Sequence, residues 1–189
     1  MKVASYQKVD EKAVLENVFS FLVKQGLESA SIREICKGTG IAQGSLYYWF
    51  DDKTTIICEA TEYGLKKVTD EIFEYVFSSV DDLKGFFENC LDRISEYKEE
   101  LRFIYQIVAS PKYGERLRKD GKYFKSIYDQ YAVKLSEYLN YDIDKVKPIV
   151  YLLVSSILDY AVWDDKENSQ AEIDFIYSIL PKVRDAADE

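Results

Sequence analysis

The chain contains no histidine among its 189 residues. Histidine is the commonest general base and the commonest transition-metal ligand in proteins, so neither kind of site has its usual foundation here. The three cysteines, Cys36, Cys58 and Cys90, are odd in number and lack CxxC spacing, and each lies in an apolar helical pattern. They are interpreted as small buried hydrophobes. No glycine loop of the phosphate-cradling kind is present either. We therefore expect no catalytic residues, no metal, no cofactor and no enzymatic activity.

Proline and glycine are also scarce, with three and eight residues. Long helices are therefore easy to accommodate, and apolar residues recur at helical spacing along nearly the whole chain. No convincing alternation of strand type, internal repeat or low-complexity tract is found. These features predict an all-α fold of about nine helices.

Long apolar runs are absent as well. The most apolar run, "IVYLLVSSIL", covers ten residues from Ile149 to Leu158, whereas a bilayer-spanning helix needs about 20. The N-terminal "MKVASYQKVDEKAVLENVFSFLV" scatters charges through its apolar positions, unlike a signal peptide. We expect a soluble, cytoplasmic protein without a membrane partner.

The formal net charge of −9 is unevenly distributed. Residues 1–53 hold seven basic and seven acidic side chains, so the whole deficit lies in residues 54–189. Such a balance argues against a protein that coats nucleic acid along its entire surface. It is compatible with a small polyanion-binding head on an acidic body.

The expected helices follow from periodicity and capping signals. A first helix over about 9–25 ends at Gly26, and a second starts at "SIRE", where Ser31 and Glu34 have the spacing of a capping box. Gly40 ends it, a third helix carries "QGSLYYW", and a fourth runs from the N-cap Asp52 to about residue 78.

Five more helices are expected over about 81–97, 100–110, 122–139, 143–164 and 169–186, with starts at Asp81, Asp142 and Asn168 or Ser169. The segment "SPKYGERLRKDGK", Ser110 to Lys122, contains proline and two glycines and is interpreted as a connecting loop or irregular helix. Its basic excess favours a solvated loop, with anion contact as the alternative.

Residues 31–50 have the pattern of a helix-turn-helix, two short helices joined at Gly40. In that motif the second helix enters the major groove of DNA, which is about 12 Å wide, and the first crosses the backbone. Four consecutive aromatic residues, Tyr47 to Phe50, close the second helix. Leu46 and Phe50 lie four apart and share the inner face, so Tyr47 and Tyr48 must point outwards.

The outward residues have chemistry that suits DNA. Gln43 can form paired hydrogen bonds to adenine, and Gly44 permits close backbone approach. Hydroxyls and the indole N–H can donate to phosphates, and Lys53 adds a charge. For Trp49, core packing and DNA contact are equally compatible with the pattern. The predicted DNA-binding residues are Ser31, Arg33, Gln43, Gly44, Ser45, Tyr47, Tyr48, Trp49 and Lys53.

The stretch "ASIREICKGTGIAQGSLYYWFDDKTTII", Ala30 to Ile57, resembles the DNA-binding segment of the TetR/AcrR family of repressors. The resemblance covers about residues 10–65. Two positions depart from the family pattern: Ala42 replaces the usual Ser or Thr cap, and Trp49 the usual His or Tyr. The matching landmarks are Ile35, Gly40, Ile41, Gly44, Ser45, Leu46, Tyr47, Phe50 and Lys53.

The resemblance implies a two-fold homodimer on a near-palindromic double-stranded DNA operator, with an inducer pocket among the fourth to eighth helices. The helix over 143–164 is apolar nearly all round, so we expect it to face its own domain on one side and a second subunit on the other. Burial within the monomer is the alternative. The predicted interface residues are Val150, Leu153, Val154, Ile157, Ile173, Ile176, Tyr177 and Leu180.

Aromatic residues throughout the body suit either an apolar ligand or a packed core. The predicted pocket residues are Phe86, Cys90, Phe103, Tyr128, Tyr131, Ser156 and Tyr160. Together these features predict a DNA-binding domain over 1–53 and a ligand-binding and dimerisation domain over 54–189. The function expected is a transcriptional repressor released by a small apolar or aromatic effector. A helical ligand-binding or adaptor protein without DNA binding is the alternative.

Overall fold

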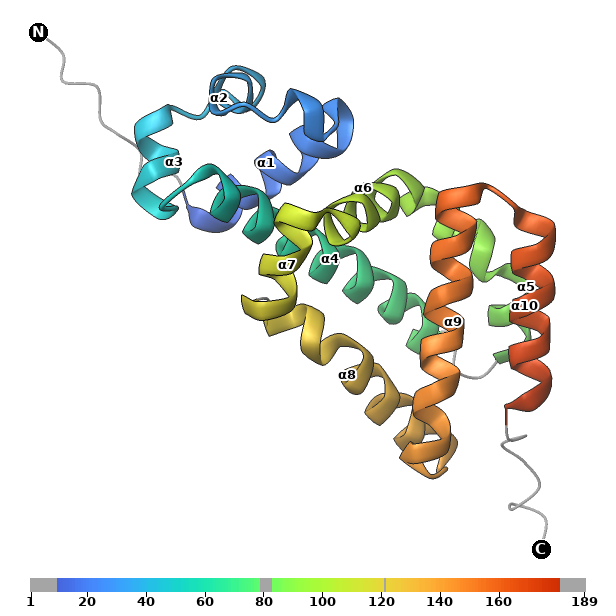
Figure 1. Cartoon of the computed structure of the whole chain (residues 1–189). Coiled ribbons are helices and arrows are strands. Elements are labelled where there is room, and N and C mark those ends of the chain that lie inside the picture. The colour runs from blue at the N-terminus through green and yellow to red at the C-terminus, as the bar shows by residue number, and fades with distance from the viewer. Residues whose placement is uncertain (1–9, 79–82, 121, 181–189) are drawn as a thin grey trace, which may run out of the picture.

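The computed structural model describes residues 10–78, 83–120 and 122–180 of the chain. All regular structure within these residues is helical, as the sequence predicts (Figure 1). Short 3-10 segments cover Leu27–Ser29 and Ser95–Tyr97. The α-helices are α1 (Glu11–Gln25), α2 (Ile32–Thr39), α3 (Gln43–Trp49), α4 (Lys53–Ser78), α5 (Leu83–Ile94), α6 (Lys98–Ala109), α7 (Pro111–Asp120), α8 (Lys122–Leu139), α9 (Ile143–Trp163) and α10 (Lys166–Ile179).

The expected helical ranges are confirmed except in two places. Residues interpreted as a connecting loop or irregular helix form the regular helix α7, because Pro111 occupies its first position, where a missing amide proton costs little. The last helix begins earlier than predicted, since the Asp165 side chain accepts from the amide of Asn168 at 3.1 Å. The predicted start at Asp81 lies outside the described residues, and α10 ends at Ile179, short of the expected end near 186.

Helices α1, α2 and α3 form a small group at one end, and α4 runs from it into the rest of the molecule (Figure 1). Helix α1 packs along α4 where Gly64 leaves room for Phe19: a Cβ at Gly64 would lie 2.3 Å from that ring. The Phe19 ring also meets Phe103 of α6 edge-on, with centroids 6.0 Å apart. These contacts fix the N-terminal group against both α4 and α6.

The remaining helices build a bundle around α9, which packs against α5, α6, α8 and α10. Its core includes the fully buried side chains Leu91, Ile107 and Ile173. Helix α9 is long and apolar enough to cross a membrane, judged by its length and composition alone. The mean hydropathy of its most apolar 18 residues is 1.4, and 39% of these residues are buried inside the protein. The ten-residue run Ile149–Leu158 lies within this helix. Since four helices pack against α9, its apolar character is explained on that side by the bundle core.

Candidate nucleic-acid interface and internal cavity

Helix α2 is capped by Ser31, whose hydroxyl accepts the amide of Glu34 at 3.2 Å. The same hydroxyl donates to the Glu34 carboxylate at 2.7 Å. Only the first half of the predicted capping box is therefore formed, since the Ser31 amide donates to Ser29 instead of Glu34. Arg33 lies exposed in the first turn of this helix.

Gly40 makes the turn between α2 and α3. It has φ +72°, in the left-handed region, and its amide donates to the Cys36 carbonyl at 2.9 Å. An L-residue with a side chain is strained in this conformation, which explains why glycine ends the helix here. The chain then turns into α3, the reading helix, Gln43–Trp49.

The reading helix has one buried and one exposed face. Leu46 is 0% and Phe50 1% exposed, and both join the same core as Ile35 of α2. Tyr47 and Tyr48 are 45% and 65% exposed, so the predicted outward orientation of these two rings is confirmed. The two buried anchors hold the helix in place while its outer face stays free for a partner.

The other predicted contact residues of α3 share this outer face or border it. Gln43 and Gly44 are exposed, and a Cβ at Gly44 would meet nothing within 4 Å. Ser45 is half-buried. Trp49 is also half-buried: it packs against the core and meets the Tyr48 ring edge-on at 4.9 Å. Trp49 therefore packs partly in the core and keeps part of its ring exposed, so both core packing and DNA contact stay open for this residue.

Asp52 caps α4, as predicted. Its Oδ1 accepts the Thr55 amide at 2.7 Å and the Thr55 hydroxyl at 2.9 Å. These hydrogen bonds, led by the one from the amide, hold the pKa of Asp52 below its ordinary value. The half-buried Lys53 is the first residue of the same helix. The start of α4 thus follows the reading helix after only a three-residue turn.

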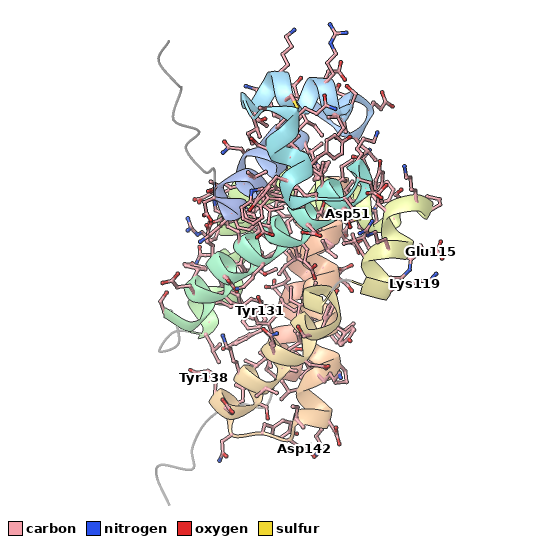
Figure 2. The ribbon with its side chains drawn as sticks, turned by 90° about the vertical axis from the view of Figure 1, so that its left-hand side faces the viewer. Asp51, Glu115, Lys119, Tyr131, Tyr138 and Asp142 are labelled. Atoms are coloured by element: carbon pink, nitrogen blue, oxygen red, sulfur yellow. The ribbon has the colours of Figure 1, made fainter. Side chains whose placement is uncertain are left out.

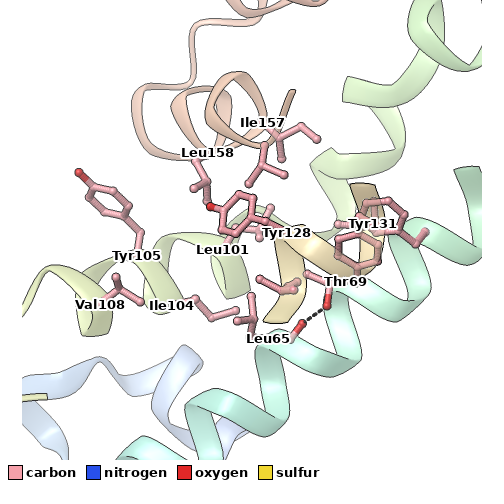
Figure 3. Close-up of a pocket in the computed structure, with 14 residues that line it drawn as sticks. Leu65, Thr69, Leu101, Ile104, Tyr105, Val108, Tyr128, Tyr131, Ile157 and Leu158 are labelled. Atoms are coloured by element: carbon pink, nitrogen blue, oxygen red, sulfur yellow. Dashed lines mark hydrogen bonds between the residues drawn. The ribbon is translucent and has the colours of Figure 1, made fainter. Parts of the chain in front are cut away.

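A cavity lies in the body, between α4, α6, α8 and α9 (Figure 3). Its volume is about 230 Å³. None of its lining residues carries a charge, and the Thr69 hydroxyl already donates to the Leu65 carbonyl at 2.6 Å. Tyr105 lies at the edge, with its hydroxyl pointing away from the other lining side chains (Figure 3). The lining residues are Leu65, Thr69, Ile72, Phe73, Leu101, Ile104, Tyr105, Val108, Ile127, Tyr128, Tyr131, Val154, Ile157 and Leu158.

Of the predicted pocket residues, Tyr128 and Tyr131 line this cavity. The other five do not line it, because their helices turn them elsewhere. Phe103 faces α1, Ser156 donates to the Leu152 carbonyl, and Tyr160 lies beneath Lys98. Phe86 and Cys90 are buried in α5, where burial raises the pKa of the Cys90 thiol to about 12.

The sequence prediction missed the wall contributed by α6. Leu101, Ile104, Tyr105 and Val108 line the cavity from that helix. Their spacing of three, one and three residues is the signature of one helical face, and that signal was available in the sequence. What the spacing alone does not reveal is whether the face meets a cavity or a filled core.

Most of the predicted interface residues lie inside the protomer. Val150, Ile157, Ile173, Ile176 and Leu180 are all buried, and Val154 and Ile157 line the cavity. Leu153 is half-buried, and Tyr177 packs near Phe87 with ring centroids 5.2 Å apart. The buried residues fit the alternative of burial within the monomer, because α9 and α10 present apolar side chains on two sides and these face the protomer core.

The fold and the reading helix define a class: an all-α regulator that binds DNA through a helix-turn-helix. Residues 19–60 match the family described as bacterial regulatory proteins, tetR family. The DNA-binding segment of this chain is thus that of the TetR family of transcriptional regulators.

Two further comparisons bear on the whole chain. A solved structure of a transcriptional regulator from Rhodococcus sp. Rha1 superposes with a TM-score of 0.56 at 18% identity, covering 90% of this chain and 95% of that one. At this identity the likeness shows a shared fold. No curated protein matches the chain.

Proposed function

We propose that the protein is a homodimeric repressor that binds a near-palindromic operator with two copies of the reading helix. Residues 1–53 bind DNA in this proposal, and residues 54–189 bind the effector and the second subunit. The observation that carries the DNA-binding part is the exposure of Tyr47 and Tyr48 on a helix whose inner face is anchored by Leu46 and Phe50. Exposed phenols at that place can donate to phosphate oxygens on either side of a groove.

The operator is read by few groups in this arrangement. The reading helix carries no charged residue, so base preference rests on Gln43, which can pair with adenine. The remaining predicted contacts, from Ser31, Arg33, Ser45, Trp49 and Lys53, position the protein on the backbone. Arg33 and Lys53 supply the charge that makes such binding depend on salt.

The effector is proposed to be a small neutral molecule, apolar or aromatic, that enters the body cavity. The uncharged lining supports this, because a charged ligand would lose its hydration without gaining a partner. The hydroxyl of Tyr128 can supply a single polar contact. Ligand pockets commonly measure roughly 300–1,000 Å³, and this cavity of about 230 Å³ lies below that range, which favours a compact ligand.

The second subunit is proposed to cover the outer face of α9 and α10. We define this outer face by its exposed residues Leu152 and Trp163 on α9 and Phe175 and Ile179 on α10. Phe175 is 63% and Trp163 75% exposed, which is unusual for such large apolar groups unless a partner covers them. Pairing two such helix pairs gives a four-helix interface, and a two-fold axis there matches a palindromic operator.

The decisive experiment is fluorescence anisotropy with DNA from upstream of the protein's own gene. Tyr47→Ala is expected to weaken binding roughly tenfold, about 1.4 kcal/mol, on all sequences, and to leave the melting temperature unchanged. Gln43→Ala should instead relax preference at one position of each half-site. The control is Tyr141→Ala, an exposed tyrosine at the α8–α9 turn.

Unchanged affinity in Tyr47→Ala would contradict the proposed interface. The alternative function, an adaptor without DNA binding, predicts no salt-dependent binding to any duplex. The zero net charge of residues 1–53 is the observation that favours this alternative.

A further inference from the structure

One wall of the cavity is tied directly to α7. The side chain of Val108 lines the cavity near the end of α6, and its carbonyl faces α7. Gly114 approaches that carbonyl so closely that a Cβ would lie 2.1 Å from its oxygen. Arg118 donates to the same oxygen at 3.3 Å. Val108 therefore cannot shift without moving the backbone of α7.

The other side of α7 rests on the first turns of α4. Tyr113 is buried there, and its carbonyl lies 3.8 Å from the Cys58 thiol, which donates to it. Arg116 reaches Asp52, with 3.6 Å between Nη1 and Oδ1. It also acts electrostatically on Glu59, which lies seven residues after Asp52 and hence on the same face of α4. Figure 2 shows Asp51 at this junction, beside the helix that carries Glu115 and Lys119.

The point that Arg116 touches is the joint between the reading helix and α4. Asp52 Oδ1 is the atom that caps α4 through Thr55, and Arg116 approaches this same atom. Phe50, the buried anchor of α3, precedes Asp52 by two residues, and Lys53 follows it. We therefore expect a displacement of α7 at this point to change the angle at which the reading helix leaves the body.

We propose that α7 is the relay between cavity and reading helix, with Arg116 as the positioning residue that fixes the start of α4. This inference rests on the proposed function and adds its route of control. A molecule in the cavity displaces Val108, α7 moves with it, and Arg116 withdraws from Asp52. The competing route is a direct push on α4, whose Leu65 and Thr69 also line the cavity.

A double-mutant cycle on operator affinity separates the two routes, with a cavity-filling side chain as the probe. Val154→Phe adds volume from α9, which is remote from α7 in the chain and contributes a different part of the lining from α4 and α6. It is expected to change operator affinity by about tenfold in the wild type, within the usual range of coupling between sites. With Arg116→Gln present, the change should shrink to less than about threefold.

Matched variants test whether the charge of Arg116 is what matters. Arg116→Lys keeps the charge and should restore most of the effect of Val154→Phe. Lys112→Gln removes a neighbouring cation that lies over the Tyr113 ring, and it should leave the effect intact. Where Val154→Phe lowers the melting temperature by more than a few degrees, Leu158→Phe fills the same cavity from the same helix.

A second measurement follows α7 itself. The Cys58 thiol is buried beneath α7 and should react faster with a thiol reagent when α7 withdraws. Cys36→Ser removes the half-buried competing thiol. In that background Val154→Phe is expected to raise the rate at Cys58 several-fold.

The outcomes are distinguishable. Equal effects of Val154→Phe with and without Arg116, or an unchanged Cys58 rate, overturn the relay and leave the repressor proposal standing. No effect of cavity filling in the wild type overturns both the relay and control by an effector. Absence of operator binding in the wild type overturns the proposed function as a whole.

Discussion

Tyr47 and Tyr48 are exposed, whereas Leu46 before them and Phe50 after them are buried. An α-helix turns by about 100° per residue, so four consecutive rings cannot share one core-facing side. The exposure of the two tyrosines was therefore predictable from the sequence. The half-burial of Trp49 was not, because it depends on how closely the neighbouring helices approach.

A substitution at Gly44 should change fold stability and DNA affinity in opposite directions. Its surroundings are open, so Gly44→Ala should stabilise the fold by up to about 1 kcal/mol through helix propensity. The added methyl group should hold the helix away from the groove and weaken operator binding roughly five- to tenfold. Urea unfolding and anisotropy on the same samples measure both effects. Unchanged affinity would show that the backbone at Gly44 does not approach the DNA.

Glu59 is a charge that the folded state tolerates poorly. Burial, followed by the nearby Glu11, raises its pKa above the ordinary 4.5, whereas Arg116 opposes the rise. As the pH rises through 4.5 towards the raised pKa, the unfolded chain loses this proton first, so folding stability declines. Glu59→Gln should therefore raise the melting temperature at pH 7, with no gain below pH 4.5.

Glu16 provides a control of opposite sign. A hydrogen bond from Lys67, 2.7 Å away, lowers its pKa, so its ionised form favours the fold. Glu16→Gln should lower the melting temperature slightly at pH 7, and the loss should disappear in acid. The same pH trend in both variants would contradict the assignment. The effect at Glu16 is small because this pair is exposed.

For the helices, capping residues and apolar periodicity could be predicted from the sequence, whereas the close packing between helices could not. Gly26, Gly40 and Asp52 end or start their helices as predicted. Helix α7 was interpreted as a connecting loop or irregular helix because proline and glycine, here Pro111 and Gly114, commonly break helices. The glycine serves instead to admit the Val108 carbonyl, a neighbour that helix periodicity does not identify.

Ala42 leaves α3 without a side-chain cap. Its backbone is extended, with φ −66° and ψ 142°, as a capping residue requires, but no side chain accepts the free amides. Ala42→Ser should stabilise the protein by about 1 kcal/mol in chemical unfolding. Ala171→Ser, an exposed change inside α10, is the control and should be neutral or slightly destabilising. Equal effects would argue against a capping origin.

Gly64 tests the joint between α1 and α4. Gly64→Ala gains helix propensity of about 1 kcal/mol, but forcing a methyl against the Phe19 ring costs roughly 1–3 kcal/mol. We expect net destabilisation of up to roughly 2 kcal/mol, measured by thermal unfolding. Phe19→Leu in the same chain should recover part of the loss. Net stabilisation by Gly64→Ala alone would show that the Phe19 ring moves aside at little energetic cost.

For the whole molecule, the acidic body and the neutral N-terminal segment follow from composition, but the assembly follows from surface shape. Phe175→Glu, on the outer face of α9 and α10, should convert the proposed dimer to monomer in sedimentation experiments. Operator affinity should then fall by about 100-fold or more, because two linked half-sites bind better than one. Val133→Glu on α8 is the control, as an exposed apolar residue outside that face. A dimer that survives Phe175→Glu contradicts the interface.

The sequence by itself determined the helices, the turn at Gly40 and the outward tyrosines of the reading helix. These features depend on residues within about one helical turn of each other, so local spacing and capping are enough. Only the tertiary structure decided which apolar face of α9 and α10 is core, which side chains line the cavity, and that Arg116 meets Asp52. Each of these features brings together residues that are distant in the chain, and their contact is set by how whole helices pack.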